Sequence, residues 1–432
     1  MHYKNSLVIT YLLSTSFDID ASRTERFLEI KEHVNDVNEL QLHIANDQIQ
    51  QDEEDEKFWE RYLQNGMSIA PTRSPTTGTL PTRSPTTTTI PPSEPTSEAP
   101  TPAPIPSTLP PFPTVCNGLT MLQRAQQLTE IARGASGNIM GRNTPQRMAL
   151  EWLIQFDLFF VCPDDPKALQ RYILAVFYFS TDGDNWDECS APDDFSDPQS
   201  IAQANANCNV VTTPIVGGDL NPSFLPTIEG TDAWLTPVYE CNWAGIACRQ
   251  ETLCVDRIEF EANGVGGILP FEVRDLPDLR FLILERGTTA GTIPAEFAQI
   301  EDLLFLDLDF NQLTGTIPEE LYTVTDLFQL DLNDNLLTGT LSPSIGDLGS
   351  LIFLQLSGND ITGTIPDEVG QLTQLLTGSF ENTGMTGSIP QALCDSLLSK
   401  PTYILITDCS PEGPGLPPKV QCTCCTDCFP DN

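Results

Sequence analysis

Glycine spacing constrains this chain more than any other feature of its sequence. Glycines recur every 24 residues at Gly267, Gly291, Gly315, Gly339, Gly363 and Gly387. Leucine, asparagine and proline positions recur in the same phase, so six units cover residues 252–395 without an insertion. Such a period is typical of solenoids, in which one unit cannot bury its own apolar face but stacked units bury a continuous core. The sequence therefore predicts an α/β repeat solenoid.

Each unit contains a short strand with alternating apolar residues, as in 303–313. Leu306 and Leu308 point inward, and Asn311 can bond backbone groups of the following turn. Gly315 allows a tight turn, and Pro318 ends the local pairing. We expect one parallel sheet along one side. The repeated inward positions are Ile258, Leu282, Leu306, Leu330 and Leu354 and, two residues later, Phe260, Leu284, Leu308, Leu332, Leu356 and Phe380.

The strand residues between these positions face the concave side and form three rows, whose neighbours are about 4.8 Å apart. We interpret the rows as an exposed aromatic stripe beside an acidic ladder, which binds a basic or amphipathic peptide segment. The alternative is that the phenylalanines pack on each other and the acids keep the array soluble. The predicted ligand-binding residues are Phe281, Phe305, Asp307, Asp309, Gln329, Asp331, Asn333, Phe353 and Gln355.

Two motifs indicate a family. Leu-Thr-Gly-Thr-Ile-Pro at 313–318, after Leu-x-Leu-x-x-Asn, resembles plant-type leucine-rich repeats. Cys241-Asn-Trp-Ala-Gly-Ile-Ala-Cys248 is similar to the N-terminal cap of that family, and the resemblance covers about 234–409. It implies a right-handed superhelix with a concave parallel sheet, as in receptor-like kinase ectodomains, receptor-like proteins and polygalacturonase inhibitors. The departures are Gly287 and Thr383 in place of asparagine, Ser342 in place of proline and Gly378 in place of leucine, the last suggesting a loosened final unit.

The rest of the chain divides by composition. Helical patterns run over Leu119–Ala132, Gln146–Phe160 and Ala168–Ser180, and Thr144-Pro145 is a plausible start for the second. We expect the third helix to be buried. The predicted regions are a signal peptide (1–16), an acidic low-structure segment (17–69), a Pro/Thr-rich stalk (70–115), a helical N-terminal cap region (116–251), the repeats (252–395) and a Cys-rich C-terminal cap and tail (396–432).

All 13 cysteines follow residue 115, which is typical of an oxidising compartment. The resemblance implies that Cys241 pairs with Cys248 and that Cys394 and Cys409 close the C-terminal cap; Cys189 and Cys208 would close an earlier loop. The dense tail at 422–428 suits either a metal or disulfides, and we favour disulfides. Cys116, Cys162 and Cys254 are candidate partners. The odd count leaves one thiol free or joined to another chain.

Charge and motifs narrow the function. With 21 basic and 60 acidic residues, the net charge of -39 excludes a phosphate-tracking nucleic-acid binder. The three histidines precede the folded region and no catalytic motif is present, so we predict no enzyme, cofactor or metal. We expect an extracellular, cell-surface or cell-wall recognition protein for a protein or peptide ligand. Wall polysaccharide binding and membrane association stay open. The alternatives are a structural wall or matrix protein, an inhibitor of wall-degrading hydrolases and, from the Thr-x-Thr array beginning at Thr314, an ice-binding protein.

Overall fold

The structure, a computed structural model, describes residues 116, 118–137, 141, 143–208, 227–411 and 417–429. The predicted signal peptide (1–16), acidic segment (17–69) and stalk (70–115) lie outside the described residues. Among the helices of the described ranges, none has the length and apolar character needed to cross a bilayer.

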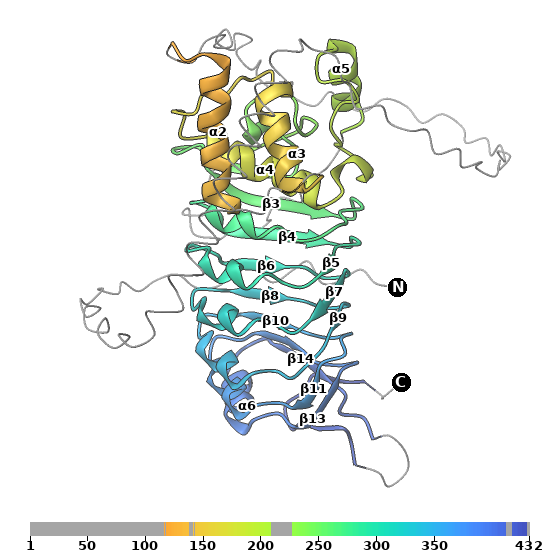
Figure 1. The fold of residues 1–432 in the computed structure, drawn as a ribbon. Coiled ribbons are helices and arrows are strands. Elements are labelled where there is room, and N and C mark those ends of the chain that lie inside the picture. Colours follow the sequence, from red (N-terminus) through yellow and green to blue (C-terminus); the bar gives the residue numbers. More distant parts are fainter. Residues whose placement is uncertain are drawn as a thin grey trace, which may run out of the picture. The chain divides into compact units, whose positions relative to one another are not determined.

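One parallel sheet runs through the repeats (Figure 1). Each unit adds a strand in the same register, so that Leu282, Leu306, Leu330 and Leu354 are direct neighbours. All are fully buried, which places the core behind the sheet and confirms the predicted solenoid. The strands in spatial order are β1 (Thr227–Glu229), β2 (Ile246–Arg249), β3 (Val255–Glu261), β4 (Phe281–Glu285), β6 (Phe305–Asp307), β8 (Gln329–Asp331), β10 (Phe353–Gln355), β12 (Thr377–Ser379), β14 (Ile404–Thr407) and β16 (Asp427–Cys428).

After each strand the chain returns through a short 3₁₀ turn, which starts at a proline in most units. Ser342 replaces that proline once, and its hydroxyl accepts a hydrogen bond from the Ser344 N–H (3.2 Å), so this turn is capped as well. Each turn buries one or two apolar side chains against its neighbours, which closes the core opposite the sheet. The turns are η5 (Phe271–Asp275), η6 (Ala295–Gln299), η7 (Glu319–Thr323), η8 (Pro343–Asp347) and η9 (Asp367–Gln371).

Two small parallel sheets link the units on another side. There the Thr314 and Thr338 hydroxyls each donate to a glycine carbonyl of the preceding unit, at 3.1 and 3.2 Å. The first threonine of each Thr-x-Thr motif therefore joins neighbouring units. The strands are β5 (Ala290–Gly291), β7 (Gln312–Gly315) and β9 (Leu336–Leu337) in one sheet, and β11 (Thr362–Thr364), β13 (Gly384–Ser388) and β15 (Val420–Gln421) in the other.

Buried asparagines form the predicted ladder between units. The Asn335 side chain donates to the carbonyls of Leu308 (2.8 Å) and Leu332 (3.2 Å) and accepts from the Leu313 N–H (3.0 Å). Asn311 and Asn359 do the same one unit to either side. Buried backbone groups left unpaired by the turns are thereby satisfied.

The last unit is not loosened as its sequence suggested. A Cβ at Gly378 would lie 2.9 Å from Leu405 and 3.1 Å from Phe380, so these side chains already fill the space of the missing leucine. The Asp408 carboxylate accepts from the Asn382 N–H (2.8 Å), close to the turn where Thr383 replaces asparagine. Residues beyond the repeats therefore complete the final unit.

A helical region covers the N-terminal end of the sheet (Figure 1). Thr144 caps α3 ahead of Pro145, as expected, and α4 is buried almost all round. Arg171 of α4 is fully buried between Asp157 (2.7 Å) and Glu240 (3.2 Å), which ties the helices to the start of the sheet. The elements are α2 (Met121–Ser136), α3 (Pro145–Glu151), the π-helical turn η1 (Trp152–Phe156), α4 (Ala168–Ser180), η2 (Gly183–Asn185), α5 (Pro198–Ala206) and η4 (Glu240–Asn242).

Six disulfides lie in and around the two ends of the array. The expected Cys394–Cys409 bond is wrong, because the tail folds back and adds β15 and β16 after helix α6 (Gln391–Leu398). The folded-back tail brings other cysteines next to Cys394 and Cys409. Cys254 alone keeps a free thiol. All four tail cysteines are bonded, so they do not form a metal site. The bonds are Cys116–Cys162, Cys189–Cys208, Cys241–Cys248, Cys394–Cys424, Cys409–Cys428 and Cys422–Cys425.

Candidate functional site

The strand register brings the predicted ligand-binding residues into rows on the face opposite the core. Phe281, Phe305, Gln329 and Phe353 are successive neighbours in one row. In the next row Asp307 lies between Ile283 and Asp331, and Gln355 follows. Whether these residues bind a ligand stays a prediction.

The expected exposed aromatic stripe is wrong at its first two members. Phe281 is 2% exposed and Phe305 7% exposed. Their rings stack with centroids 4.9 Å apart, and the guanidinium of Arg257 lies 5.1 Å from the Phe281 ring centroid. The arginine and the second ring cover the surfaces that a ligand would need. Phe353 is half-buried.

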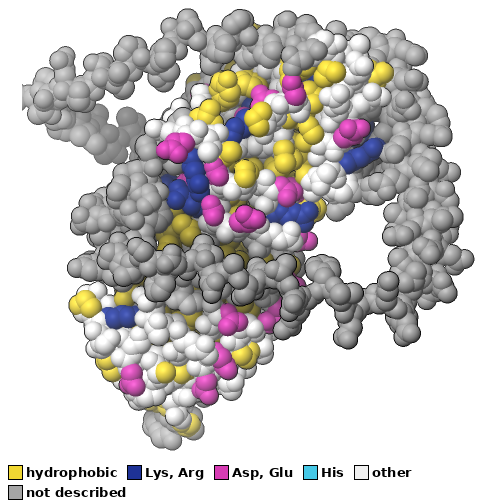
Figure 2. All heavy atoms as spheres, turned by 90° about the vertical axis from the view of Figure 1, so that its left-hand side faces the viewer, with side chains coloured by type: hydrophobic (Ala, Val, Ile, Leu, Met, Phe, Trp, Pro, Cys, Tyr) yellow, Lys and Arg dark blue, Asp and Glu magenta, His cyan; other side chains and the backbone are white. Residues whose placement is uncertain are grey.

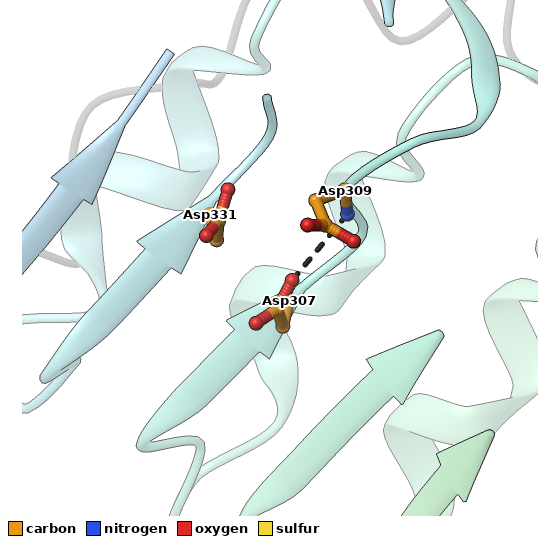
Figure 3. Close-up of side chains that lie close together, drawn as sticks. All are labelled: Asp307, Asp309 and Asp331. Carbon is orange, nitrogen blue, oxygen red and sulfur yellow. Dashed lines mark hydrogen bonds between the residues drawn. The ribbon is translucent and has the colours of Figure 1, made fainter. Parts of the chain in front are cut away.

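Three carboxylates of neighbouring units converge beside this row (Figure 3). Asp307 ends strand β6, Asp309 follows it, and Asp331 ends strand β8. One oxygen from each lies within 4.8 Å of the others. Asp307 is 6% exposed and Asp331 4% exposed. We call these three residues the Asp triad.

Most of the hydrogen bonds to the Asp triad come from neutral groups. The Gln329 amide donates to Asp307 at 2.6 Å, and the Gln355 amide donates to Asp331. The backbone N–H of Asn333 donates to Asp331 at 3.1 Å. Asp309 Oδ1 is buried and has no hydrogen-bond partner among the described residues. Neutral donors orient the carboxylates without cancelling their charge.

Burial and mutual repulsion raise the pKa values of the Asp triad. Loss of solvent is the largest cause for Asp307 and Asp331, whose pKa values lie well above the usual range; neighbouring carboxylates raise them further. Burial raises the pKa of Asp309 to about 6, and the charge of Asp334 adds to that effect, whereas Arg286 opposes it. For Glu285, one strand away, burial and the charge of Asp309 raise the pKa to about 7. The site favours either a proton or a cation.

No described lysine or arginine forms an ion pair with the Asp triad. The nearby Arg286 pairs with Glu261 instead. Elsewhere acidic groups have basic neighbours: Arg249 contacts Asp256 (3.2 Å) and Asp302 (3.2 Å). Figure 2, which views the molecule from the left of Figure 1, also shows Lys and Arg beside Asp and Glu on the part of that face nearest the N-terminal helices. Within the described ranges, the Asp triad is therefore a negative site without a direct ion-pair partner, and Arg286 acts on Asp309 only from a distance.

Two classes of cation suit these oxygens. A guanidinium or ammonium group would accept the carboxylates as charge-assisted hydrogen-bond partners. A hard divalent ion such as calcium also prefers carboxylate oxygens, but it takes about six to eight ligands. Gln329 and Gln355 direct amide nitrogens, not oxygens, at Asp307 and Asp331.

Sequence reasoning missed Phe310, which follows Asp309 directly. Its side chain is 47% exposed, and its backbone is left-handed with a φ of 48°. The sequence contains a signal for it: the residue before the repeated asparagine position is Ala262, Arg286, Asp334, Gly358 or Asn382 in the other units, and only here is it aromatic. The exposed aromatic group at this site is thus Phe310.

Comparisons with known proteins agree with the repeat geometry. The family model described as Leucine Rich Repeat matches residues 302–323 and 350–372. No curated protein matches the chain significantly.

Several solved plant structures are similar to part of this chain. The plant peptide hormone receptor RGFR1 in complex with RGF2 is 33% identical over 34% of this chain and 23% of its own, with a TM-score of 0.32. A second structure is the ectodomain of the receptor kinase GASSHO1/SCHENGEN3 from Arabidopsis thaliana in complex with CASPARIAN STRIP INTEGRITY FACTOR 2. It is 26% identical over 40% of this chain and 20% of its own, with a TM-score of 0.37. The ectodomain of the receptor kinase SOBIR1 from Arabidopsis thaliana is 25% identical over 34% of this chain and 82% of its own, with a TM-score of 0.31.

The chain spans less than a quarter of the length of the first two structures. The similarity to RGFR1 and to SOBIR1 covers about a third of this chain in each case. The repeat spacing, the family match and the parallel sheet with one short strand per unit lead to the same assignment. The 24-residue units are leucine-rich repeats, and they form a solenoid preceded by a helical cap region.

Proposed function

We propose that this chain is a non-catalytic recognition module that binds a basic segment of a protein or peptide on the open face of its parallel sheet. The observation that carries the proposal is the Asp triad, three carboxylates within 4.8 Å that lack a basic partner among the described residues. A cationic side chain from a ligand would supply the missing charge.

Electrostatics supports a ligand at this place over a purely structural role. Buried carboxylates without a cation destabilise the fold, because desolvation is not offset by attraction. A bound cation removes that penalty, so part of the binding free energy comes from relief of repulsion. The large negative charge of the chain also attracts basic partners over a distance.

The six disulfides support an extracellular location, since such bonds form and persist in oxidising compartments. A secreted or surface-displayed protein of this kind would meet peptides and proteins outside the cell. We therefore propose an extracellular recognition role and no activity of its own.

The test is a selection of random 12-residue peptides, displayed on phage, against the full chain at pH 7.5. We expect the selected peptides to be rich in arginine or lysine. The double variant Asp307→Asn, Asp331→Asn should lose that enrichment. The matched control, Glu301→Gln with Asp326→Asn, removes two exposed acids from turns of the same units and should keep it.

Two results would contradict the proposal. The first is a selection that yields peptides without basic residues, or one in which the triad variant enriches basic peptides as strongly as the wild type. Either outcome would show that the Asp triad does not recognise a basic segment. Calorimetric titration with calcium chloride provides the second check. Tight calcium binding that disappears in Asp307→Asn, Asp331→Asn would assign the Asp triad to a metal ion instead.

A further inference from the structure

Phe310 has an unusual backbone for a large side chain. Its φ of 48° lies in the left-handed region, where an aromatic residue is a conformational outlier. Its ring is nevertheless 47% exposed, so burial does not offset the strain. Both properties are unfavourable for folding.

The fold requires the left-handed backbone but not the aromatic ring. The equivalent residues have similar φ values: 54° at Arg286, 49° at Asp334, 66° at Gly358 and 53° at Asn382. Asp, Asn and Gly tolerate this conformation best, because a short polar side chain or the lack of one reduces the clash. Phenylalanine at this position therefore has no evident structural advantage.

The surroundings of Phe310 show what its ring can contact. On the side of the preceding unit, the Arg286 guanidinium lies 5.8 Å from the ring centroid and pairs with Glu261. On the side of the following unit is the exposed Asp334, whose charge acts on both Asp309 and Asp331. The ring therefore has a guanidinium on one side that already pairs with Glu261, and its residue directly follows Asp309 of the Asp triad and bonds the backbone of Asn333 in the next unit.

Resting on the proposed function, we infer that Phe310 is a specificity-determining residue that selects an arginine side chain in the bound peptide. The guanidinium of that arginine stacks on the Phe310 ring, and its N–H groups donate to Asp309, Asp331 and Asp334. A planar guanidinium can make both contacts at once, whereas the ammonium of lysine is a compact, strongly hydrated charge that stacks poorly. Charge complementarity identifies the occupant as a cation, and the ring identifies it as arginine.

The first test is Phe310→Asn, which places at this position the residue found at 382. We expect a higher thermal unfolding midpoint, because the strain is relieved. We also expect binding of an arginine-containing peptide selected on the wild-type chain to weaken about tenfold. Phe310→Leu, which keeps an apolar side chain without an aromatic face, should bind as weakly.

The control is Leu336→Asn. Leu336 is 51% exposed but belongs to strand β9 of a small sheet, so removing its apolar side chain should leave peptide binding unchanged. A loss there equal to that of Phe310→Asn would show a general effect of surface apolar groups and would overturn the inference.

The second test replaces the arginine of the selected peptide by lysine. In the wild type this change should weaken binding about tenfold, and in Phe310→Asn it should have little further effect. Equal losses in both proteins would overturn the role of Phe310 while leaving the Asp triad as a site for basic residues. If Asp307→Asn, Asp331→Asn also bound the peptide normally, the proposed function itself would fail.

Discussion

Single carboxylates on the sheet make the stability of this protein depend on pH. The pKa of Asp309 rises from 3.8 to about 6 in the folded chain, and that of Glu285 rises from 4.5 to about 7. As pH rises, the unfolded chain therefore releases its protons first. The stability that these groups contribute is fully present below their pKa values in the unfolded chain. It is lost as pH rises through their pKa values in the folded chain.

We expect the free energy of unfolding of the wild type to fall between pH 5 and pH 7.5. The Asp307→Asn variant should show a smaller decrease, because the neutral amide removes one repelling charge from the cluster. Urea denaturation of both proteins at the two pH values measures this, with Glu301→Gln as a control for an exposed acid. A wild type that gains stability over this range faster than the variant would contradict the raised pKa values.

Residue roles could be predicted from the sequence where the period alone decides them. The inward leucines and the asparagine ladder follow from the repeat, because each has an equivalent partner one unit away. Burial of Phe281 and Phe305 does not follow, since it depends partly on the conformation of Arg257, the preceding member of their row, whose guanidinium lies near the Phe281 ring. The left-handed backbone of Phe310 is a local dihedral that the residue type itself disfavours.

Among the elements, helix α4 is tied to other parts of the cap region through one buried charge. Arg171 contacts Asp157 and Glu240, which are separated from it by 14 and 69 residues, and no local pattern indicates that these groups meet. The bounds of α4 match the helical pattern in the sequence, and its apolar residues account for that. The π-helical turn after α3 was missed, because the sequence pattern reads as one continuous helix.

Replacing Arg171 by alanine should destabilise the fold by about 3–5 kcal/mol, since two carboxylates would stay buried without their cation. Chemical denaturation measures the loss. Arg274→Ala, which removes a partly exposed pair with Asp275, should change stability by less than about 1 kcal/mol. Comparable effects of the two substitutions would show that the buried network contributes little.

Over the molecule as a whole, both ends of the array need segments outside the 24-residue units. At the N-terminal end, β1 and β2 pair antiparallel to their neighbours and interrupt the parallel order. At the C-terminal end, the tail supplies β15 and β16 and three of the six disulfides. The period predicted the array between these ends but not the path of the tail, because tail pairing depends on contacts that no repeat specifies.

The Cys394–Cys424 bond closes 30 residues between helix α6 and the tail. The Cys394→Ser, Cys424→Ser variant should lose about 3–4 kcal/mol of stability through the greater entropy of its unfolded chain. Differential scanning calorimetry of the oxidised protein measures the change in unfolding midpoint. An unchanged midpoint would show that β15 and β16 hold the tail without the bond.

The Asp triad is shared between two consecutive units, and this has a consequence for how binding preference can change. Deleting or duplicating one whole unit keeps the leucine core and the asparagine ladder in register, because the length of every unit is the same. The side chains that meet across the junction would nevertheless be different. Under the proposed function, recombination between units would alter ligand choice in a single genetic step, while the scaffold is inherited intact.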